Sequence, residues 1–234
     1  MYIPRLFHET DWPVIKRVIE ENSFATVVTC SAGQPTATHV PLRLIEAADG
    51  TAKLQGHFSK ANPHWRLFQQ AEGKEQENED ENDPAPRSLV IFSGPDSYVS
   101  PRWYDHVNVP TWNYVAVHVY GKARLITDPA EMHEMMKGLV DRYEGHPNDG
   151  QPAAETEAGN RYTLDGLPPD FLASQMKGIV GFEISVDEIQ ASFKLSQNRD
   201  QKNYENVVAE LRKSDNQKSQ DVAQIMSDRR PPKP

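Results

Sequence analysis

The sequence predicts a β-rich α+β fold with antiparallel strands in the body and helices attached around it. The run at 24–30 is rich in β-branched residues, and short turns separate it from runs at 36–45 and 51–58 that can pair with each other. A long run at 114–126 alternates valine with other residues, as a strand with two different faces does. With 234 residues the chain can bury a sizeable core, and we expect one domain over 1–234.

The first expected element is a helix that begins after Asp11 and ends near Glu21. Asp11 is a typical N-cap, Pro13 fits the first turn, and the aliphatic residues between 14 and 19 share one helical face. The three strands that follow are joined by the turns at 31–34 and 48–50, so we expect an antiparallel meander.

An acidic stretch follows a short predicted helix, which begins at Asn62 and Pro63 and runs through Gln70. Residues 72–83 hold seven acidic residues and one lysine, a charge of −6 within a formal net charge of −9. Because the stretch contains no aromatic residue and could bury little surface, we expect 72–86 to be a flexible surface insertion.

The remaining elements alternate between strands and helices. Asp128, Pro129 and Glu131 predict a capped helix through Tyr143, with its methionines on the inner face, and Gly121 indicates a bulge or bend. The other expected elements are a strand at 88–92, a long loop at 144–166, a helix at 168–176, a strand at 179–186, a polar connection at 194–199 and two C-terminal helices at 202–213 and 219–227.

Charge and cysteine content narrow the class of protein. Outside the acidic stretch the chain is nearly balanced, so no basic face favours direct nucleic-acid binding. Cys30 is the sole cysteine, which excludes an intramolecular disulfide, and we expect it to be a small buried hydrophobe. Charged residues interrupt the N-terminal segment, and no apolar run is long enough to span a membrane. We therefore expect a cytoplasmic protein without a membrane partner.

The segment 56–63 has the residue types of a phosphate site. His57, Ser59 and Lys60 stand where a strand ends, and Asn62 begins the next helix, so hydroxyl, ammonium and backbone donors would lie together. The alternative is that Ser59 caps the turn and Lys60 is solvated. Residue types alone leave both interpretations open.

Aromatic residues gather in polar, proline-containing segments. Trp65, Trp103, Tyr104, Trp112 and Tyr114 could stack on a conjugated ring. They could equally seal a dimer interface, which is also rich in tryptophan and tyrosine, and residue types alone favour the interface. The two roles are compatible if a cofactor lies between subunits.

Several reaction classes lack their motifs. The chain has no Gly-x-Ser-x-Gly elbow, no Gly-rich dinucleotide fingerprint and no P-loop. No zinc signature is present, so we predict no metal site. A single histidine can still serve as an axial haem ligand, and His118 and His57 are the candidates for that role.

Taken together, the motifs resemble the PaiB family. The resemblance runs from the first residue to the C-terminal helices and rests on Met1-Tyr2-Ile3-Pro4, Gly56-His57-Phe58-Ser59-Lys60-Ala61-Asn62-Pro63, Tyr98-Val99-Ser100-Pro101-Arg102-Trp103-Tyr104, Val109-Pro110-Thr111-Trp112-Asn113-Tyr114 and Lys194-Leu195-Ser196-Gln197-Asn198-Arg199.

The resemblance implies a split β-barrel related to the pyridoxamine-phosphate-oxidase-like flavin proteins, with FMN at the interface of a homodimer. It implies that Ser59, Lys60 and Asn62 hold the flavin phosphate, where many members carry arginine in place of Lys60. The full predicted cofactor site consists of His57, Ser59, Lys60, Asn62, Trp65, Trp103, Tyr104, Trp112, Asn113, Lys194, Ser196, Gln197 and Arg199.

Three functions follow as alternatives. The first is an FMN-binding protein with a redox or regulatory role, for which the catalytic residues and the enzymatic activity are left open. The second is a haem-binding or haem-degrading protein on the same barrel, and the third is a transcriptional regulatory scaffold without a cofactor. The expected helices at 200–230, packed on the barrel, carry six acidic and six basic residues, so regulation by direct DNA contact is disfavoured.

Overall fold

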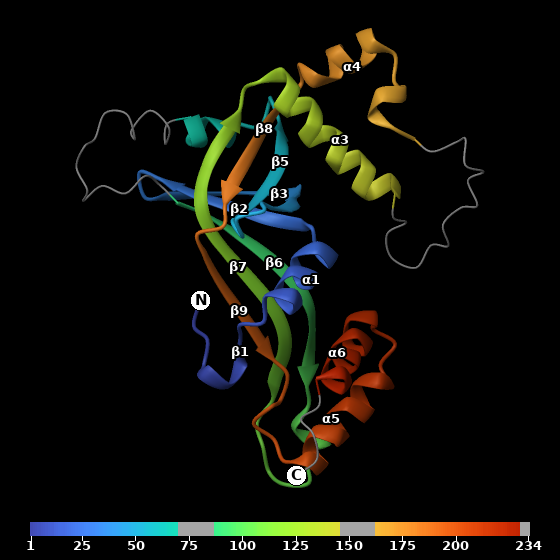
Figure 1. Ribbon diagram of the computed structural model, residues 1–234. Coiled ribbons are helices and arrows are strands. Elements are labelled where there is room, and N and C mark those ends of the chain that lie inside the picture. The colour runs from blue at the N-terminus through green and yellow to red at the C-terminus, as the bar shows by residue number, and fades with distance from the viewer. Residues whose placement is uncertain (70–86, 146–161, 230–234) are drawn as a thin grey trace. The chain divides into compact units, whose positions relative to one another are not determined.

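The computed structural model describes residues 1–69, 87–145 and 162–229. These residues form a mostly antiparallel sheet of nine strands with helices attached (Figure 1). The strands pair in the order β3-β2-β6-β7-β8-β5-β4, and β9 pairs with β7 and β1. The predicted insertion at 72–86 lies outside the described residues, as does most of the loop predicted at 144–166.

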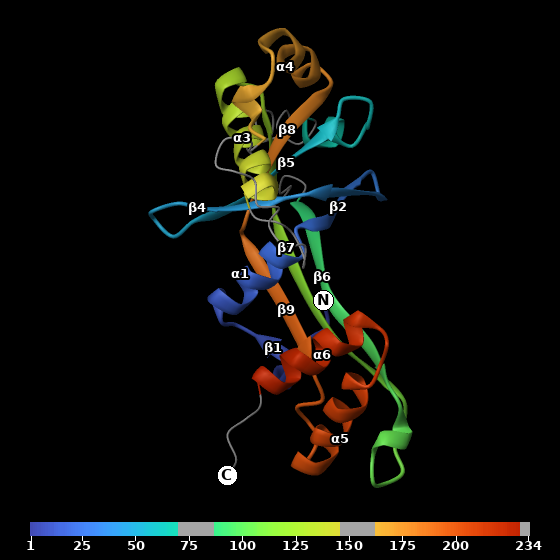
Figure 2. The ribbon, with the colours of Figure 1, turned by 90° about the vertical axis from the view of Figure 1, so that its right-hand side faces the viewer.

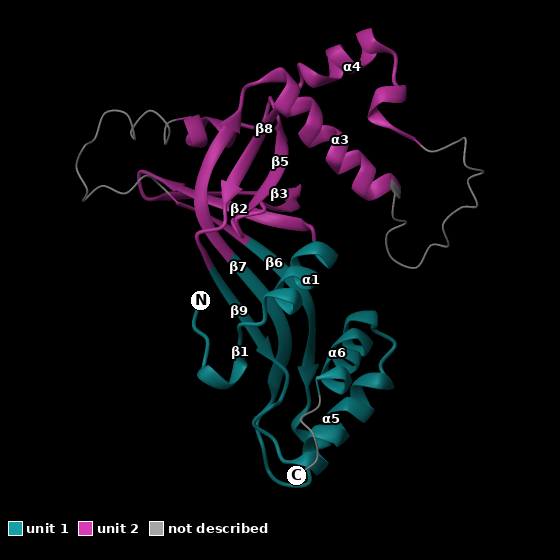
Figure 3. Ribbon diagram, in the orientation of Figure 1, with its two compact units in different colours: residues 1–22, 91–118, 189–234 teal, residues 23–90, 119–188 magenta. Residues whose placement is uncertain are grey.

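The chain divides into two compact units (Figure 3). Unit 1 comprises residues 1–22, 91–118 and 189–234, and unit 2 comprises residues 23–90 and 119–188. The two longest strands, β6 (Arg87–Val99) and β7 (Thr111–Ile126), contribute residues to both units. The single domain expected over 1–234 stays a prediction.

Unit 2 contains two hairpins rather than the predicted meander. β2 (Phe24–Ser31) pairs with β3 (Gln34–Pro41), whereas β4 (Arg43–Glu46) pairs with β5 (Ala52–Ser59). The continuous strand expected at 36–45 is interrupted at Leu42, which is buried and donates its N–H to the carbonyl of Ser23 at 2.8 Å. β5 then takes β8 (Ile179–Ser185) as its second partner.

The helix that follows β7 packs on the sheet of unit 2 through its methionines. α3 (Pro129–Gly145) begins as predicted, with the Asp128 carboxylate accepting the N–H of Glu131 at 2.8 Å. It approaches β8 so closely that a Cβ at Gly181 would stand 2.7 Å from the Met132 sulfur, which confirms the packing role of the methionines. η3 (Leu164–Gly166) and α4 (Pro169–Met176) follow.

Gly121 in β7 is required by a close approach between strands of unit 2. A Cβ at this position would stand 1.7 Å from the carbonyl oxygen of Ser185, so any other residue would force these two segments of the backbone apart. β7 runs through Gly121 without interruption, and the bulge or bend expected there stays a prediction.

Unit 1 holds both chain-terminal segments. Its elements are η1 (Arg5–Phe7), β1 (His8–Glu9), α1 (Trp12–Glu21), η2 (Pro101–Trp103), β9 (Glu188–Lys194), α5 (Gln201–Arg212) and α6 (Gln217–Asp228). The three predicted helices are confirmed, and α5 and α6 lie side by side in Figure 2. Sequence reasoning missed β1 and β9 and ended β6 seven residues early, at 92 instead of Val99.

The expectation of a buried Cys30 is wrong. β2 alternates the buried residues Ala25, Val27 and Thr29 with outward positions, and Cys30 falls on the exposed face. Within the described ranges, every helix is too short or too polar to cross a membrane.

Candidate cofactor site

The predicted cofactor residues fall into two groups, one in each unit. Unit 2 holds His57, Ser59, Lys60, Asn62 and Trp65, and unit 1 holds Trp103, Tyr104, Trp112, Asn113, Lys194, Ser196, Gln197 and Arg199.

In unit 2, the turn after β5 carries the lysine of the predicted phosphate site, Lys60. The N–H of Lys60 donates to the carbonyl of Gly178 at 2.8 Å, and Ser59 Oγ accepts the N–H of Ala61 at 3.3 Å. Ser59 therefore caps the turn, while its own hydroxyl proton stays available for donation. The Lys60 side chain is exposed and has no carboxylate partner among the described residues.

Asn62 belongs to a chain of polar side chains that we name the histidine network: Asn62, Thr38, His64, Thr29 and Ser88. Asn62 donates to Thr38 Oγ1 at 3.2 Å, and Thr38 Oγ1 lies 2.9 Å from His64 Nδ1. His64 Nε2 lies 3.0 Å from Thr29 Oγ1, which in turn contacts the Ser88 hydroxyl at 2.8 Å. Both ring nitrogens of His64 are thus satisfied, as expected of a buried polar group.

His64 also fills the hydrophobic core of unit 2. Its ring is 1% exposed and stacks on Phe58 with 4.9 Å between centroids, and Phe58 stacks on Phe182 at 4.5 Å. Burial lowers the pKa of His64, so the neutral imidazole is the stable form here. His64 therefore belongs to the core of unit 2.

His57 and Trp65 complete the unit 2 group. His57 is half-buried, its Nδ1 is buried without a hydrogen-bond partner in the described structure, and burial lowers its pKa. The indole of Trp65 donates to the carbonyl of Lys60 at 3.1 Å, which holds the ring against the turn.

In unit 1, the aromatic residues differ in exposure. Trp112 is 52% exposed and Tyr98 45% exposed, and the two rings meet edge to face at 6.0 Å between centroids. Trp103 is half-buried in η2, whereas Tyr104 is 8% exposed and its hydroxyl is buried without a partner among the described residues. Tyr98 was not among the predicted residues.

Three predicted residues hold the turn that follows β9. The Asn113 side chain, which is fully buried, both donates to and accepts from the Ser196 hydroxyl, at 3.0 and 3.1 Å. Gln197 accepts the N–H of Leu195 at 2.7 Å, and Ser196 adopts a left-handed backbone conformation with φ 61°. These contacts fix the turn from within unit 1, and direct contact with a cofactor stays a prediction.

Two cations lie on either side of that turn. Lys194 Nζ donates to Thr111 Oγ1, and burial together with the charge of Arg199 lowers the pKa of Lys194. The Arg199 guanidinium lies 4.8 Å from the centroid of the Tyr104 ring, and it donates to Asn108 Oδ1 at 3.4 Å. Asn108, which sequence reasoning missed, has a buried Nδ2 without a partner among the described residues.

Asp105 lies beside these residues in the sequence, but its carboxylate is already ion-paired with another residue. Its carboxylate binds Lys202 at 2.9 Å, Asn203 at 2.9 Å and His106 at 3.0 Å. The hydrogen bond from Lys202, followed by those from His106 and Asn203, holds the pKa of Asp105 well below its usual value. The negative charge of Asp105 is thus balanced by Lys202 and does not act as the counterion of Lys194 or Arg199.

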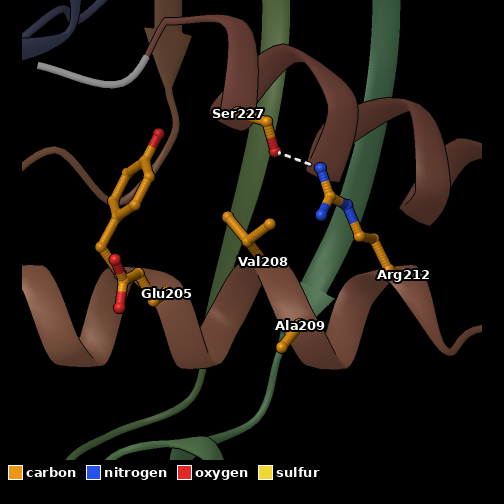
Figure 4. A pocket seen from close by; sticks show the side chains of 6 residues that line it. Glu205, Val208, Ala209, Arg212 and Ser227 are labelled. Carbon is orange, nitrogen blue, oxygen red and sulfur yellow. Dashed lines mark hydrogen bonds between the residues drawn. The ribbon is translucent and has the colours of Figure 1, made fainter.

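Two hollows lie away from the predicted residues. One of about 250 Å³ lies between α5 and α6, where Arg212 donates to Ser227 at 2.8 Å (Figure 4). Another of about 420 Å³ in unit 2 is lined mainly by apolar residues of α3 and α4. Over the described parts of the chain, no three His, Cys, Asp or Glu side chains gather as a metal site would require.

The haem candidate of unit 1, His118, resembles His57 in its environment. Its Nδ1 is buried and has no hydrogen-bond partner among the described residues. Burial and the positive charge of the chain's amino terminus lower its pKa, which favours the neutral imidazole that ligates metals.

Comparisons with known proteins agree with the motifs. Residues 1–188 match a family described as "Putative FMN-binding domain". The Protease synthase and sporulation protein PAI 2 of Bacillus subtilis (strain 168) is 40% identical over 229 residues, which cover 98% of each chain.

Two solved structures share the fold at low identity. The flavocytochrome Anf3 from Azotobacter vinelandii has a TM-score of 0.56 and 19% identity, and the match covers 87% of this chain and 78% of that one. An FAD and haem binding protein from Mycobacterium smegmatis has a TM-score of 0.55 and 16% identity, and the match covers 86% of this chain and 79% of that one. The family match, the relative and the β-rich split-barrel fold place the chain in the PaiB family of FMN-binding proteins.

Proposed function

We propose that this protein binds FMN at the interface of a homodimer and uses it in a redox or regulatory role. The observation that carries the proposal is the match of residues 1–188 to an FMN-binding family, because that range includes the turn with Lys60. A flavin carries its own redox chemistry, so the chain has to bind it, orient it and shield it from water.

The turn after β5 fits the phosphate of FMN. Lys60 offers an ammonium group without a carboxylate partner in the described chain, and the Ser59 hydroxyl can still donate its proton. Asn62 and Trp65 hold this turn in place through Thr38 and the Lys60 carbonyl. In this proposal Ser59 and Lys60 bind the phosphate, and Asn62 and Trp65 position them.

The aromatic residues of unit 1 fit a flat ring and a subunit contact. Trp112 of β7 and Tyr98 of β6 expose large faces, and Val107 and Val109 in the connection between these strands are also exposed. Exposed tryptophan and tyrosine are enriched at protein interfaces. We propose that this surface meets a second copy of the chain, with Trp112 and Asn113 near the isoalloxazine ring.

A regulatory role is supported by the name of the Bacillus relative, which links that protein to protease synthesis and sporulation. The balanced charge of α5 and α6 favours regulation through redox state, a metabolite or a protein partner over contact with DNA. We propose a regulatory effect that depends on the flavin.

Haem binding is the second candidate, because two observations favour it. His57 and His118 each carry a buried ring nitrogen without a partner in the described residues, and both have lowered pKa values. Two proteins of similar fold are named for haem as well as flavin. A haem protein would absorb intensely at about 400 nm, whereas a flavoprotein absorbs at about 450 nm.

The test of the proposed function begins with an absorbance scan of the purified protein and mass spectrometry of any released cofactor. FMN is then titrated into wild type, Lys60→Met and the control Lys218→Met, whose lysine pairs with Asp96 on the surface of unit 1. We expect Lys60→Met to weaken FMN binding about tenfold, the effect of one charge-assisted hydrogen bond.

Three outcomes would contradict the proposal. A Soret band would favour haem. A colourless protein whose melting temperature does not rise with FMN would favour the scaffold without a cofactor, because a ligand that binds the folded state must stabilise it. If riboflavin, which lacks the phosphate, bound as tightly as FMN, Lys60 would not bind the phosphate.

A further inference from the structure

Unit 1 contains two buried hydrogen-bonding groups that its own residues leave without partners. The Tyr104 hydroxyl belongs to a side chain that is 8% exposed, and the Asn108 Nδ2 atom is buried as well. Neither atom has a partner in the described parts of the chain. Buried polar groups are almost always hydrogen-bonded in folded proteins, so two such atoms on one short segment indicate that a ligand completes them.

Two cations of unit 1, one of which contacts both Tyr104 and Asn108, have no counterion among the described residues. Lys194 and Arg199 are half-buried, and neither forms an ion pair with a carboxylate of the described residues. The acidic residues adjacent in sequence are occupied elsewhere: Asp105 binds Lys202, and Asp200 caps α5 through the N–H of Asn203 at 3.0 Å. Two like charges that are partly removed from water repel each other unless an anion joins them.

Arg199 connects these groups. Its guanidinium lies 4.8 Å from the Tyr104 ring centroid and donates to Asn108 at 3.4 Å, while its charge acts on Lys194. The planar guanidinium fork matches a carboxylate or a phosphate, and a hydroxyl and an amide N–H add further donors.

We propose that Tyr104, Asn108, Lys194 and Arg199, which we name the oxyanion cluster, bind the carboxylate or phosphate group of a second ligand, separate from the phosphate of FMN. The oxyanion cluster stands on unit 1 alone. Its assignment to a second ligand rests on the proposed function, in which Lys60 of unit 2 holds the FMN phosphate. The protein then acts on, or responds to, an acidic small molecule.

Inorganic phosphate is the first probe, titrated by calorimetry and thermal shift at constant ionic strength. Wild type is compared with Tyr104→Phe, Arg199→Met and the control Lys218→Met, both without flavin and with saturating FMN. We expect phosphate to raise the melting temperature of wild type and of the control. Arg199→Met should weaken phosphate binding about tenfold or more, because a charge-assisted contact is lost.

Tyr104→Phe is the sharper variant because it removes only one oxygen atom. Without phosphate it should melt at the same temperature as wild type or higher, since a buried hydroxyl without a partner is removed. With phosphate it should gain less than wild type does. This combination distinguishes a hydroxyl that binds phosphate from one that stabilises the fold. If the Tyr104 hydroxyl stabilised the fold, Tyr104→Phe would lower the melting temperature even without phosphate.

Two results would overturn the proposal. Equal phosphate responses in wild type, Arg199→Met and Tyr104→Phe would show that the oxyanion cluster binds no anion. If saturating FMN abolished the phosphate response, and Arg199→Met lost the preference for FMN over riboflavin, the cluster would hold the cofactor's own phosphate and the second ligand would be rejected. Failure of FMN to bind would leave the phosphate response of the oxyanion cluster intact, so the two proposals fail separately.

Discussion

The histidine network of unit 2 and the oxyanion cluster of unit 1 are both built from buried or half-buried polar side chains, and they differ in how these are satisfied. In the histidine network, both ring nitrogens of His64 have hydroxyl partners. In the oxyanion cluster, Tyr104 and Asn108 each keep a buried atom without a partner in the described residues. The satisfied group stabilises its unit, whereas the unsatisfied one is prepared for a ligand.

The difference teaches that residue type alone does not mark a binding site. Asn62 and His64 lie in the segment that looks most like a phosphate site, yet their polar atoms serve the fold. Asn108 lies in a loop without a recognisable pattern, yet its Nδ2 has no hydrogen-bond partner among the described residues. What distinguishes the two is the number of hydrogen bonds that remain to be made.

The largest predicted effect is in the histidine network. His64→Ala removes the ring that stacks on Phe58 and takes one hydrogen bond from each of the Thr38 and Thr29 hydroxyls. We expect a loss of about 3–5 kcal/mol in the free energy of unfolding, measured with urea. The exposed His39→Ala is the matched control and should change it by less than about 0.5 kcal/mol. If His64→Ala lowered the free energy of unfolding by less than about 1 kcal/mol, the histidine network would not stabilise unit 2 as the comparison with the oxyanion cluster requires.

A smaller loss of stability is predicted for Asn113 in unit 1. Its side chain has hydrogen-bond partners within the unit, unlike the Tyr104 hydroxyl and Asn108 Nδ2 of the oxyanion cluster, which have none among the described residues. Asn113→Ala breaks the paired hydrogen bonds with Ser196 and opens a space beside Met226, whose sulfur lies 3.4 Å from the Asn113 amide. We expect unfolding by urea to become easier by about 2 kcal/mol. Should Asn113→Ala be neutral for stability while FMN binding is lost, Asn113 would belong with the ligand-binding groups instead.

Sequence periodicity predicted much of the fold because most elements bury one face. α1, α3, α5 and α6 follow apolar repeats and capping residues, such as Asp128 and Asp200, that act locally. β9 escaped prediction because its ladder is made with strands distant in sequence, including β1 at the other end of the chain. The break at Leu42 likewise depends on a bond to Ser23 that no local pattern encodes.

The candidate site was predictable in composition but not in the role of each residue. The motifs around Lys60 and Lys194 pointed to segments whose lysines form no ion pair with a carboxylate of the described residues, and their role in cofactor binding stays a prediction. Which polar atoms are satisfied depends on pairs far apart in the chain, such as Asn113 with Ser196 and Asn203 with Asp105. These pairs exist only in the folded chain, so the free donors of Tyr104 and Asn108 could be recognised only there.

The smallest predicted effect concerns acid stability and the charge state of His64. Burial lowers the pKa of His64, His57 and His118, so below the unfolded value of about 6.5 the unfolded chain binds protons that the folded chain does not. Stability is therefore complete above about pH 6.5 and falls as the pH decreases through that value, by at most about 1.4 kcal/mol per pH unit for each histidine.

Urea unfolding at pH 7.5 and pH 5.5 tests this with His64→Phe, which keeps an aromatic ring beside Phe58 but binds no proton. The lowered pKa values of Asp105 and Glu183 place the titration of those carboxylates at lower pH, so histidines control this window. We expect His64→Phe to lose less stability than wild type between the two pH values, although its stability at pH 7.5 is lower because the Thr38 and Thr29 hydroxyls each lose one hydrogen bond. An equal loss in both proteins would mean that His64 takes up its proton while folded. Its hydroxyl partners would then accept from a charged ring, and the histidine network would be a proton-binding group and not a fixed part of the core.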